Sequence, residues 1–196
     1  MSNNKKTKEA VDESLHFEKI TWDNFEAIIN LHVKKEQQNY VARNKDSLVH
    51  ACVCMISEGK QVVPLGIYKG KKPVGFIMIG YDVGEDDGTE PSDEWFLRNS
   101  YCIWRFMIDR RYQGNGYGRE AFRLALEYCR TFPMGEAKYC WLSYEPENEV
   151  AKKLYLSFGF KELPEHYEEG EEMPAVLELE GKMLKTKEGR RIISLT

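Results

Sequence analysis

Residues 104–122, WRFMIDRRYQGNGYGREAF, carry three glycines within five positions, Gly114, Gly116 and Gly118. The segment 100–109 is apolar on both faces, which is typical of a central strand. Beyond the glycines, apolar residues recur at the spacing of an amphipathic helix. A glycine-rich turn between strand and helix lets backbone N–H groups approach an anion, because glycine lacks a Cβ and a helix start leaves N–H groups unpaired. The stretch predicts either a pyrophosphate-binding turn or a turn that serves only chain reversal.

Two other glycine patterns do not fit this stretch. A P-loop ends in Gly-Lys-Ser or Gly-Lys-Thr, whereas Gly118 is followed by Arg119 and Glu120. A Rossmann turn, G-x-G-x-x-G, needs glycine at the position that Arg119 occupies, and it follows the first strand of a parallel unit. A pyrophosphate site here therefore belongs to another class.

The rest of the chain alternates between strand and helix patterns. Two apolar runs separated by the turn KGKK predict a hairpin, and later strands connect through helices. This order predicts an α/β fold with a mixed sheet covered on both faces. We expect strands at 16–20, 61–68, 72–81, 100–109, 137–144 and 175–180, and helices at 21–33, from Asp46 or Ser47 to 56 with Leu48, Cys52, Met55 and Ile56 on its buried face, from about 117 to 132, and at 148–158.

The chain reads as one domain between two polar ends. Residues 1–14 are expected to form a flexible tail and 15–180 the domain, and 181–196 a basic tail or an extra edge strand. The five cysteines are widely spaced in apolar context, which predicts reduced core thiols and a cytoplasmic location. No Cys or His pairs lie at zinc-binding spacing, so no metal site is expected.

Composition narrows the choice of partners. The net charge is −4, which argues against nucleic acid and favours a cationic partner. The longest apolar run, 73–81, is far shorter than the roughly 20 residues of a membrane-spanning helix. We therefore expect neither a nucleic-acid nor a membrane partner.

The motif Gln113-x-x-Gly116-x-Gly118 resembles the acetyl-coenzyme A signature Q/R-x-x-G-x-G/A of the GNAT acetyltransferase superfamily. In that family the signature follows the fourth strand and begins the third helix, as it does in the pattern here. The resemblance covers roughly residues 16–180. It implies a GNAT-type mixed, mostly antiparallel central sheet flanked by helices on both faces, and an N-acetyltransferase with acetyl-CoA as cosubstrate. A non-catalytic acyl-CoA-binding module is the alternative.

The resemblance also implies which residues hold the cosubstrate. Backbone groups of Phe106, Met107 and Ile108 would pair with the pantetheine arm, and Arg111 and Arg119 would add charge near the phosphates. The N–H groups of the turn would hold the pyrophosphate; these belong to Gln113, Gly114, Asn115, Gly116, Tyr117, Gly118 and Arg119.

A second segment, ENEVAKKLYLSFGF at 147–160, resembles the later motif of the same family. There an asparagine contacts the cofactor and a tyrosine protonates the departing thiolate. These roles fall on Asn148 and, as the catalytic residue, on Tyr155. Taken alone, Tyr155 on an apolar helical face also fits a core aromatic whose hydroxyl is hydrogen-bonded.

The general base is not evident from the sequence. Asp109 before a loop is typical of a turn residue, which leaves Glu36 or Glu94, acting through water, as weak candidates. The runs 85–94 and 161–172 are acidic and read either as solvated charge or as a path for a polycation. Aromatic faces for ammonium groups would come from Tyr40, Tyr81 and Trp104.

Finer likeness lies in 31–41, LHVKKEQQNYV, and 63–68, VPLGIY, which look like the bacterial spermine/spermidine N-acetyltransferase subgroup. This implies transfer of an acetyl group to a primary amine of spermidine or spermine by direct attack. Aminoglycoside and protein-amine acceptors stay open as alternatives, as does a homodimer.

Overall fold

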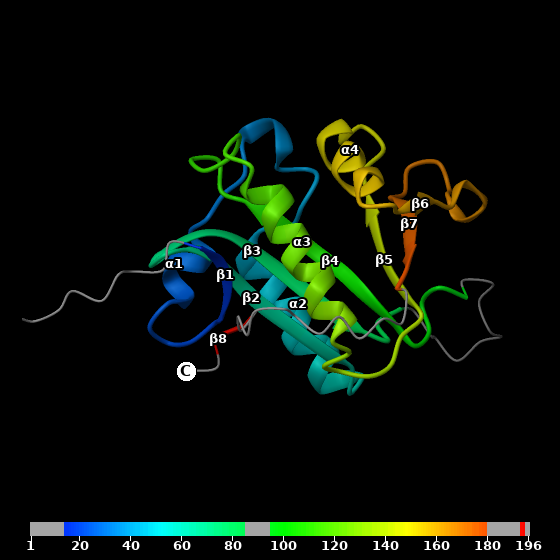
Figure 1. The fold of residues 1–196 in the computed structure, drawn as a ribbon, viewed down its shortest axis with the longest axis horizontal. Helices are drawn as coiled ribbons and strands as arrows, with labels where there is room; N and C mark the ends of the chain where they lie inside the picture. The colour runs from blue at the N-terminus through cyan, green and yellow to red at the C-terminus, as the bar shows by residue number, and fades with distance from the viewer. Residues whose placement is uncertain (1–13, 85–94, 180–192, 195–196) are drawn as a thin grey trace, which may run out of the picture.

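The computed structural model describes residues 14–84, 95–179 and 193–194 (Figure 1). The predicted N-terminal tail, most of the segment 181–196 and Glu94 lie outside the described residues. The elements, in chain order, are β1 (Leu15–Lys19), α1 (Phe25–Ile29), the 3-10 turn η1 (Lys35–Gln37), α2 (Asn44–Ser57), β2 (Gln61–Lys69), β3 (Lys72–Tyr81), β4 (Ser100–Ile108), α3 (Tyr117–Arg130), β5 (Tyr139–Tyr144), α4 (Glu149–Ser157), β6 (Lys161–Glu162), the 3-10 turn η2 (Pro164–His166), β7 (Met173–Glu178) and β8 (Ile193–Ser194).

The strands form one mixed sheet in the order β6-β7-β5-β4-β3-β2-β1-β8. Five of the neighbouring pairs are antiparallel, and β4–β5 and β1–β8 are parallel. The predicted mixed, mostly antiparallel sheet is confirmed. The last long strand begins two residues earlier than expected, at Met173, and the two-residue strand β6 was not anticipated. Strand β8 lies at one edge of the sheet, within the segment 181–196, for which an extra edge strand was one of the two alternatives.

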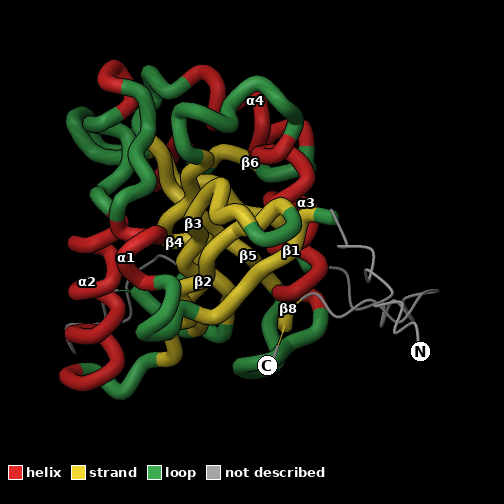
Figure 2. Tube along the Cα trace, turned by 90° about the vertical axis from the view of Figure 1, so that its left-hand side faces the viewer, coloured by secondary structure: helices red, strands yellow, loops and turns green. Residues whose placement is uncertain are grey.

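Helices cover both faces of the sheet, as predicted (Figure 2). Along β3 the side chains alternate: Ile77 and Ile79 pack in the cluster that contains α3, while Phe76 and Met78 pack in the cluster that contains residues of α1 and α2. This period of two follows from the pleat of a strand. Because both faces are buried, the run reads as continuously apolar in sequence.

The first helix is much shorter than the predicted span of 21–33. It comprises only Phe25–Ile29, preceded by a turn in which the Thr21 carbonyl accepts hydrogen bonds from the N–H groups of Asn24 and Phe25. After the helix, the N–H of His32 donates to the carboxylate of Asp109 at 2.9 Å. A long-range partner therefore takes the chain away from the helix axis, although the apolar spacing continues.

The buried face of α2 also differs from the prediction. Cys52, Met55 and Ile56 are exposed, and the inward positions are Asn44, Ser47, Ala51 and Cys54. The inward polar groups are satisfied locally: Asn44 donates to the Ile28 carbonyl and Ser47 to the Arg43 carbonyl. Periodicity that counts apolar residues alone misses such a face. Consequently Cys52 is not a core thiol, whereas the other four cysteines are buried, and all five are free.

Candidate active site

The site is built where β4 and β5 separate. Their parallel pairing comprises three residue pairs and ends at Cys102 and Trp141, although β4 continues to Ile108 and β5 to Tyr144. Figure 1 shows the two strands diverging toward the end that carries α4. From Ile103 onward, none of the strands that the structure describes pairs with this edge of β4.

A β-bulge lies at the start of this open edge. In the β3–β4 ladder Ile79 faces Ile103 and Met78 faces Arg105, so Trp104 is the extra residue. A bulge redirects side chains and bends the strand. Here Trp104 and Arg105 both line the space between the diverging strands.

This space is a cleft of about 620 Å³. Ten of the predicted site residues line it, together with residues of the loop before α2 and Glu172, which precedes β7. The predicted residues at the cleft are Tyr40, Trp104, Phe106, Met107, Ile108, Gln113, Gly114, Gly118, Asn148 and Tyr155.

The glycine turn forms one end of the cleft. Gly114 and Gly116 have φ of +80° and +77°, in the left-handed region that glycine adopts without strain, and no atom lies within 4 Å of a Cβ built on either. A Cβ on Gly118 would meet only Ile108, at 3.7 Å. Helix α3 begins at Tyr117, and its first intrahelical bond runs from Glu120 N–H to the Gly116 carbonyl. None of the backbone hydrogen bonds between described residues is donated by the N–H groups of 113–116.

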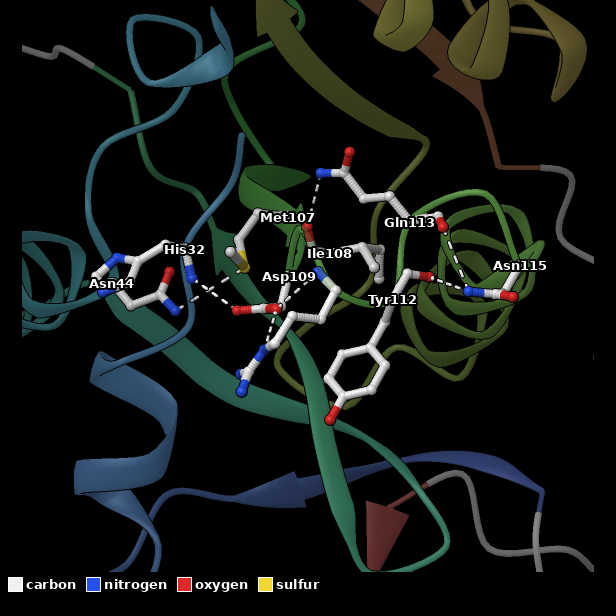
Figure 3. A network of polar contacts seen from close by, with 9 residues as sticks. His32, Asn44, Met107, Ile108, Asp109, Tyr112, Gln113 and Asn115 are labelled. Atoms are coloured by element: carbon white, nitrogen blue, oxygen red, sulfur yellow. Dashed lines mark hydrogen bonds and ion pairs between the residues drawn. The ribbon is translucent and has the colours of Figure 1, made fainter. Parts of the chain in front are cut away.

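Two amide side chains hold the turn in place (Figure 3). The Gln113 amide donates to the Ile108 carbonyl and to Gln37 Oε1, both at 2.9 Å. The Asn115 amide donates to the carbonyls of Tyr112, at 3.0 Å, and Gln113, at 3.3 Å. These polar groups organise the backbone, so the turn is shaped before any ligand arrives.

Asp109 holds the start of the turn through hydrogen bonds (Figure 3). Its side chain is 2% exposed and accepts hydrogen bonds from the N–H groups of His32 and Arg111 and from Arg111 Nε, the last at 2.7 Å. Burial opposes ionisation, but these donors outweigh it and hold the pKa of Asp109 below its usual value. Asp109 is thus a structural turn residue, as expected, and it also holds Arg111.

The remaining predicted phosphate residues lie beside the cleft and do not line it. Arg119 donates to the Ser157 hydroxyl at 2.7 Å and lies 4.9 Å from the centre of the Phe158 ring. It therefore links α3 to the end of α4. Asn115, Gly116 and Tyr117 belong to the turn but are not lining residues.

Helix α4 supplies the opposite wall. Asn148 caps it, with Oδ1 accepting from the Ala151 N–H at 3.2 Å. Tyr155 is 8% exposed and packs against Phe122, with ring centres 5.0 Å apart, and against Tyr144 at 5.5 Å. Burial, with a smaller contribution from the charge of Glu172, raises the pKa of Tyr155. Tyr155 is therefore a core aromatic that also reaches the cleft, and its hydroxyl stays protonated at neutral pH.

Two predicted substrate residues lie elsewhere. The Tyr81 hydroxyl donates to the Glu136 carbonyl at 2.9 Å, and its ring packs on Tyr101, at the far end of β3 from the cleft. Tyr81 therefore supports the segment before β5, because its hydroxyl is already used. Glu36 lies exposed on η1 and does not line the cleft. Both assignments are corrected.

The sequence did not single out two other residues at the cleft, Ser143 and Glu172. Ser143 lies on β5, two residues beyond the last pair with β4, and its hydroxyl donates to the Glu172 carboxylate. The run 161–172 had been recognised as acidic, but its periodicity could not tell which carboxylate enters the cleft. In the described ranges, no group of three His, Cys, Asp or Glu side chains is arranged to hold a metal ion, and no helix there combines the length and apolar character of a bilayer-spanning one.

Residues 17–160 match the model of the acetyltransferase (GNAT) family. The chain belongs to this family. A spermine/spermidine N(1)-acetyltransferase of Bacillus subtilis (strain 168) is 30% identical over 148 residues, which cover 76% of this chain and 88% of the relative. The order of elements around the cleft is thus that of a GNAT N-acetyltransferase.

Solved structures show the same GNAT fold. An aminoglycoside acetyltransferase, AAC(6')-Ib, in complex with coenzyme A has a TM-score of 0.63 at 16% identity, covering 84% of this chain and 95% of that one. The PaiA N-acetyltransferase of Thermoplasma acidophilum, also with coenzyme A, has a TM-score of 0.56 at 15% identity, covering 84% and 99%. Coenzyme A as the ligand of these two proteins is consistent with acetyl-CoA as the GNAT cosubstrate.

Proposed function

We propose that this GNAT N-acetyltransferase transfers the acetyl group of acetyl-CoA to a primary amine of a small polycation of the spermidine or spermine type. The observation that carries the proposal is the divergence of β4 from β5 beyond Cys102 and Trp141. It leaves a strand edge, a glycine turn and a buried tyrosine hydroxyl around one cleft. These are the features that a thioester donor with a diphosphate requires.

The residues present fit such a donor. The open edge at Phe106–Ile108 offers backbone N–H and C=O groups to an amide-containing arm, as an added strand would. The turn offers N–H groups around Gly114 and Gly118 at the start of α3, where the helix dipole favours an anion. Asn148, whose amide nitrogen is not used by its capping bond, would add a donor from α4.

Acetyl-CoA supplies an activated carbonyl and a thiolate leaving group, and the chain supplies an acid. As the amine nitrogen forms its bond to the carbonyl carbon and the carbon–sulfur bond breaks, the Tyr155 hydroxyl gives its proton to the sulfur. The nitrogen loses its excess proton to solvent, and the Tyr155 phenolate regains a proton from solvent. A raised pKa suits Tyr155 to this task, because the group is then fully protonated when the sulfur needs the proton.

Three observations support a cationic acceptor. The relative from Bacillus subtilis bears the name spermine/spermidine N(1)-acetyltransferase. Tyr40 and Trp104, which present aromatic faces suited to ammonium groups, line the cleft. A carboxylate, Glu172, lies there as well.

The five free cysteines suit a reducing cytoplasm, where we place the protein.

Thiol release from acetyl-CoA tests the proposal. The purified protein is assayed with spermidine, spermine, an aminoglycoside and a lysine peptide at equal concentration. We expect kcat/KM for the polyamines to exceed that for the other acceptors by about tenfold or more. Preference for the aminoglycoside or the peptide would replace the acceptor class. Tight binding of coenzyme A without release with any amine would identify a non-catalytic acyl-CoA module.

A further inference from the structure

Glu172 differs in charge from the other residues that line the cleft. Among the described residues that line it, Glu172 is the one carboxylate, and Lys34 and Arg105 are the cationic residues. Glu172 precedes β7, while Ser143 comes from β5, so the loop and the strand meet at the cleft wall. The bond from Ser143 orients the carboxylate there.

The surroundings place Glu172 near the reacting groups. Its charge contributes to the raised pKa of Tyr155, after burial, and counteracts the burial that lowers the pKa of Arg105. All three side chains line the same cleft. Glu172 therefore shares this space with the acid proposed to serve the leaving thiolate.

Further carboxylates gather on the same side. Burial raises the pKa of Glu145, and the charges of Glu172, Glu147 and Glu171 raise it further. These residues come from the loop after β5 and the loop before β7. Several negative charges from two loops thus create a potential that attracts a polycation.

Glu172 itself has no cationic partner in the part of the chain that the structure describes. Arg105, which also lines the cleft, directs Nη1 to the Trp104 carbonyl at 2.8 Å, and its Nε is buried without a hydrogen-bond partner among the described residues. A carboxylate at a cleft wall with one serine donor retains acceptor capacity for an ammonium group.

The positive charge of that ammonium group indicates which nitrogen of the substrate lies beside Glu172. A carboxylate stabilises the protonated form of an amine beside it, whereas the attacking nitrogen must be neutral. The partner of Glu172 is therefore a second nitrogen of the acceptor. On the basis of the proposed function, we propose that Glu172, oriented by Ser143, binds the ammonium group next to the reacting amine and makes the enzyme select diamines and polyamines over monoamines.

The test compares 1,3-diaminopropane with propylamine, which lacks the second ammonium. For the wild-type protein and for Glu172→Gln, kcat/KM is measured with both amines by thiol release. The isosteric variant should lower the diamine-to-monoamine ratio about tenfold or more, because a charge-assisted hydrogen bond is lost. The monoamine value should change less than about threefold. Comparing the two ratios cancels the intrinsic reactivity of each amine.

Two further variants sharpen the experiment. Glu169→Gln removes the same charge from an exposed position of the same loop that does not line the cleft, and it should keep the wild-type ratio. Ser143→Ala should lower the ratio partway, because the carboxylate loses its orienting donor. The dissociation constant of coenzyme A, measured by calorimetry, should be unchanged in Glu172→Gln and reports that the cleft is intact.

The outcomes separate the two proposals. An unchanged ratio in Glu172→Gln, or an equal loss with both amines, overturns the role of Glu172 in selectivity, even if the wild-type enzyme acetylates polyamines. Wild-type protein that releases no thiol with any amine overturns the proposed function and this inference together. A lowered ratio with intact coenzyme A binding supports both.

Discussion

Cys102 and Trp141 are the last paired residues of the parallel strands β4 and β5. Because β4 and β5 are parallel, their C-terminal ends lie at the same end of the sheet. The helices that follow them, α3 and α4, begin there. Ligands of sheets with parallel strands bind at such ends for this reason. The separation after Cys102 and Trp141 then opens the cleft between the two helix starts. This relationship places residues of the glycine turn and the tyrosine of α4 around one cleft.

The open edge of β4 makes a prediction for hydrogen exchange. Backbone N–H groups of 103–108 that point away from β3 should exchange quickly in the free protein, since β5 does not cover them. Coenzyme A should slow their exchange by about tenfold or more, while the paired residues 100–102 change little. Exchange followed by mass spectrometry measures both. Equal slowing along the whole strand would indicate general stabilisation and no added strand.

The glycine turn predicts that Gly118 tolerates a methyl group. A Cβ there meets only Ile108 at 3.7 Å, so Gly118→Ala should leave the melting temperature within a few degrees, and alanine favours the helix by about 0.5–1 kcal/mol. The signature that the turn resembles takes either Gly or Ala at this position, so the dissociation constant of coenzyme A should change less than about threefold.

The matched variant is Gly116→Val, at a φ of +77°. Valine there should lower stability by roughly 1–2 kcal/mol, because a β-branched residue is strained in the left-handed region. It should also raise the dissociation constant of coenzyme A by about tenfold or more, because a branched side chain obstructs the approach of the diphosphate. Calorimetry of both variants checks the pair; unchanged affinity in Gly116→Val would contradict the anion-binding turn.

Tyr155→Phe tests the acid. The ring still packs on Phe122 and Tyr144, so coenzyme A binding should change less than about twofold, while kcat falls roughly 10²-fold or more for lack of a proton donor. The raised pKa keeps the wild-type hydroxyl protonated, so kcat/KM should rise up to about pH 9 as more amine becomes neutral. A parallel loss of affinity and turnover would assign Tyr155 to packing alone.

Asp109 controls stability and not chemistry. Asp109→Ala leaves the His32 and Arg111 N–H groups without their acceptor and should cost about 2–4 kcal/mol of unfolding free energy. The pKa of Asp109 is lowered in the folded state, so its contribution is complete above the unfolded value of about 3.9 and is lost as the pH falls through the folded value. The gap between wild type and variant in urea denaturation should therefore be constant at neutral pH and shrink below about pH 4.

As a control for this prediction, Asp46→Ala removes a carboxylate whose partner, Arg43, is the solvent-exposed residue that precedes α2. Its effect on the urea midpoint should be clearly smaller, because exposed pairs contribute little. Equal effects of the two substitutions on the urea midpoint would show that the buried hydrogen bonds of Asp109 add no more stability than an exposed ion pair.

Local patterns in the sequence determined most strands, the glycine turn and helix α4. The alternation along β3 and the apolar run of β4 are set by the pleat and by burial on both faces, and the turn by glycines that tolerate positive φ. These features depend on residues close together in the chain, so their spacing is readable without a structure.

Tertiary structure alone decided where several side chains act. Helix α1 ends early because His32 meets Asp109, 77 residues away, and α2 turns Asn44 inward because the Ile28 carbonyl accepts its bond. For the same reason Tyr81, a candidate from the sequence, lies away from the cleft, whereas Glu172, which the sequence did not single out, lines it. Whether a side chain reaches the cleft depends on which strands become neighbours, and that pairing is a contact between distant residues, which local spacing does not encode.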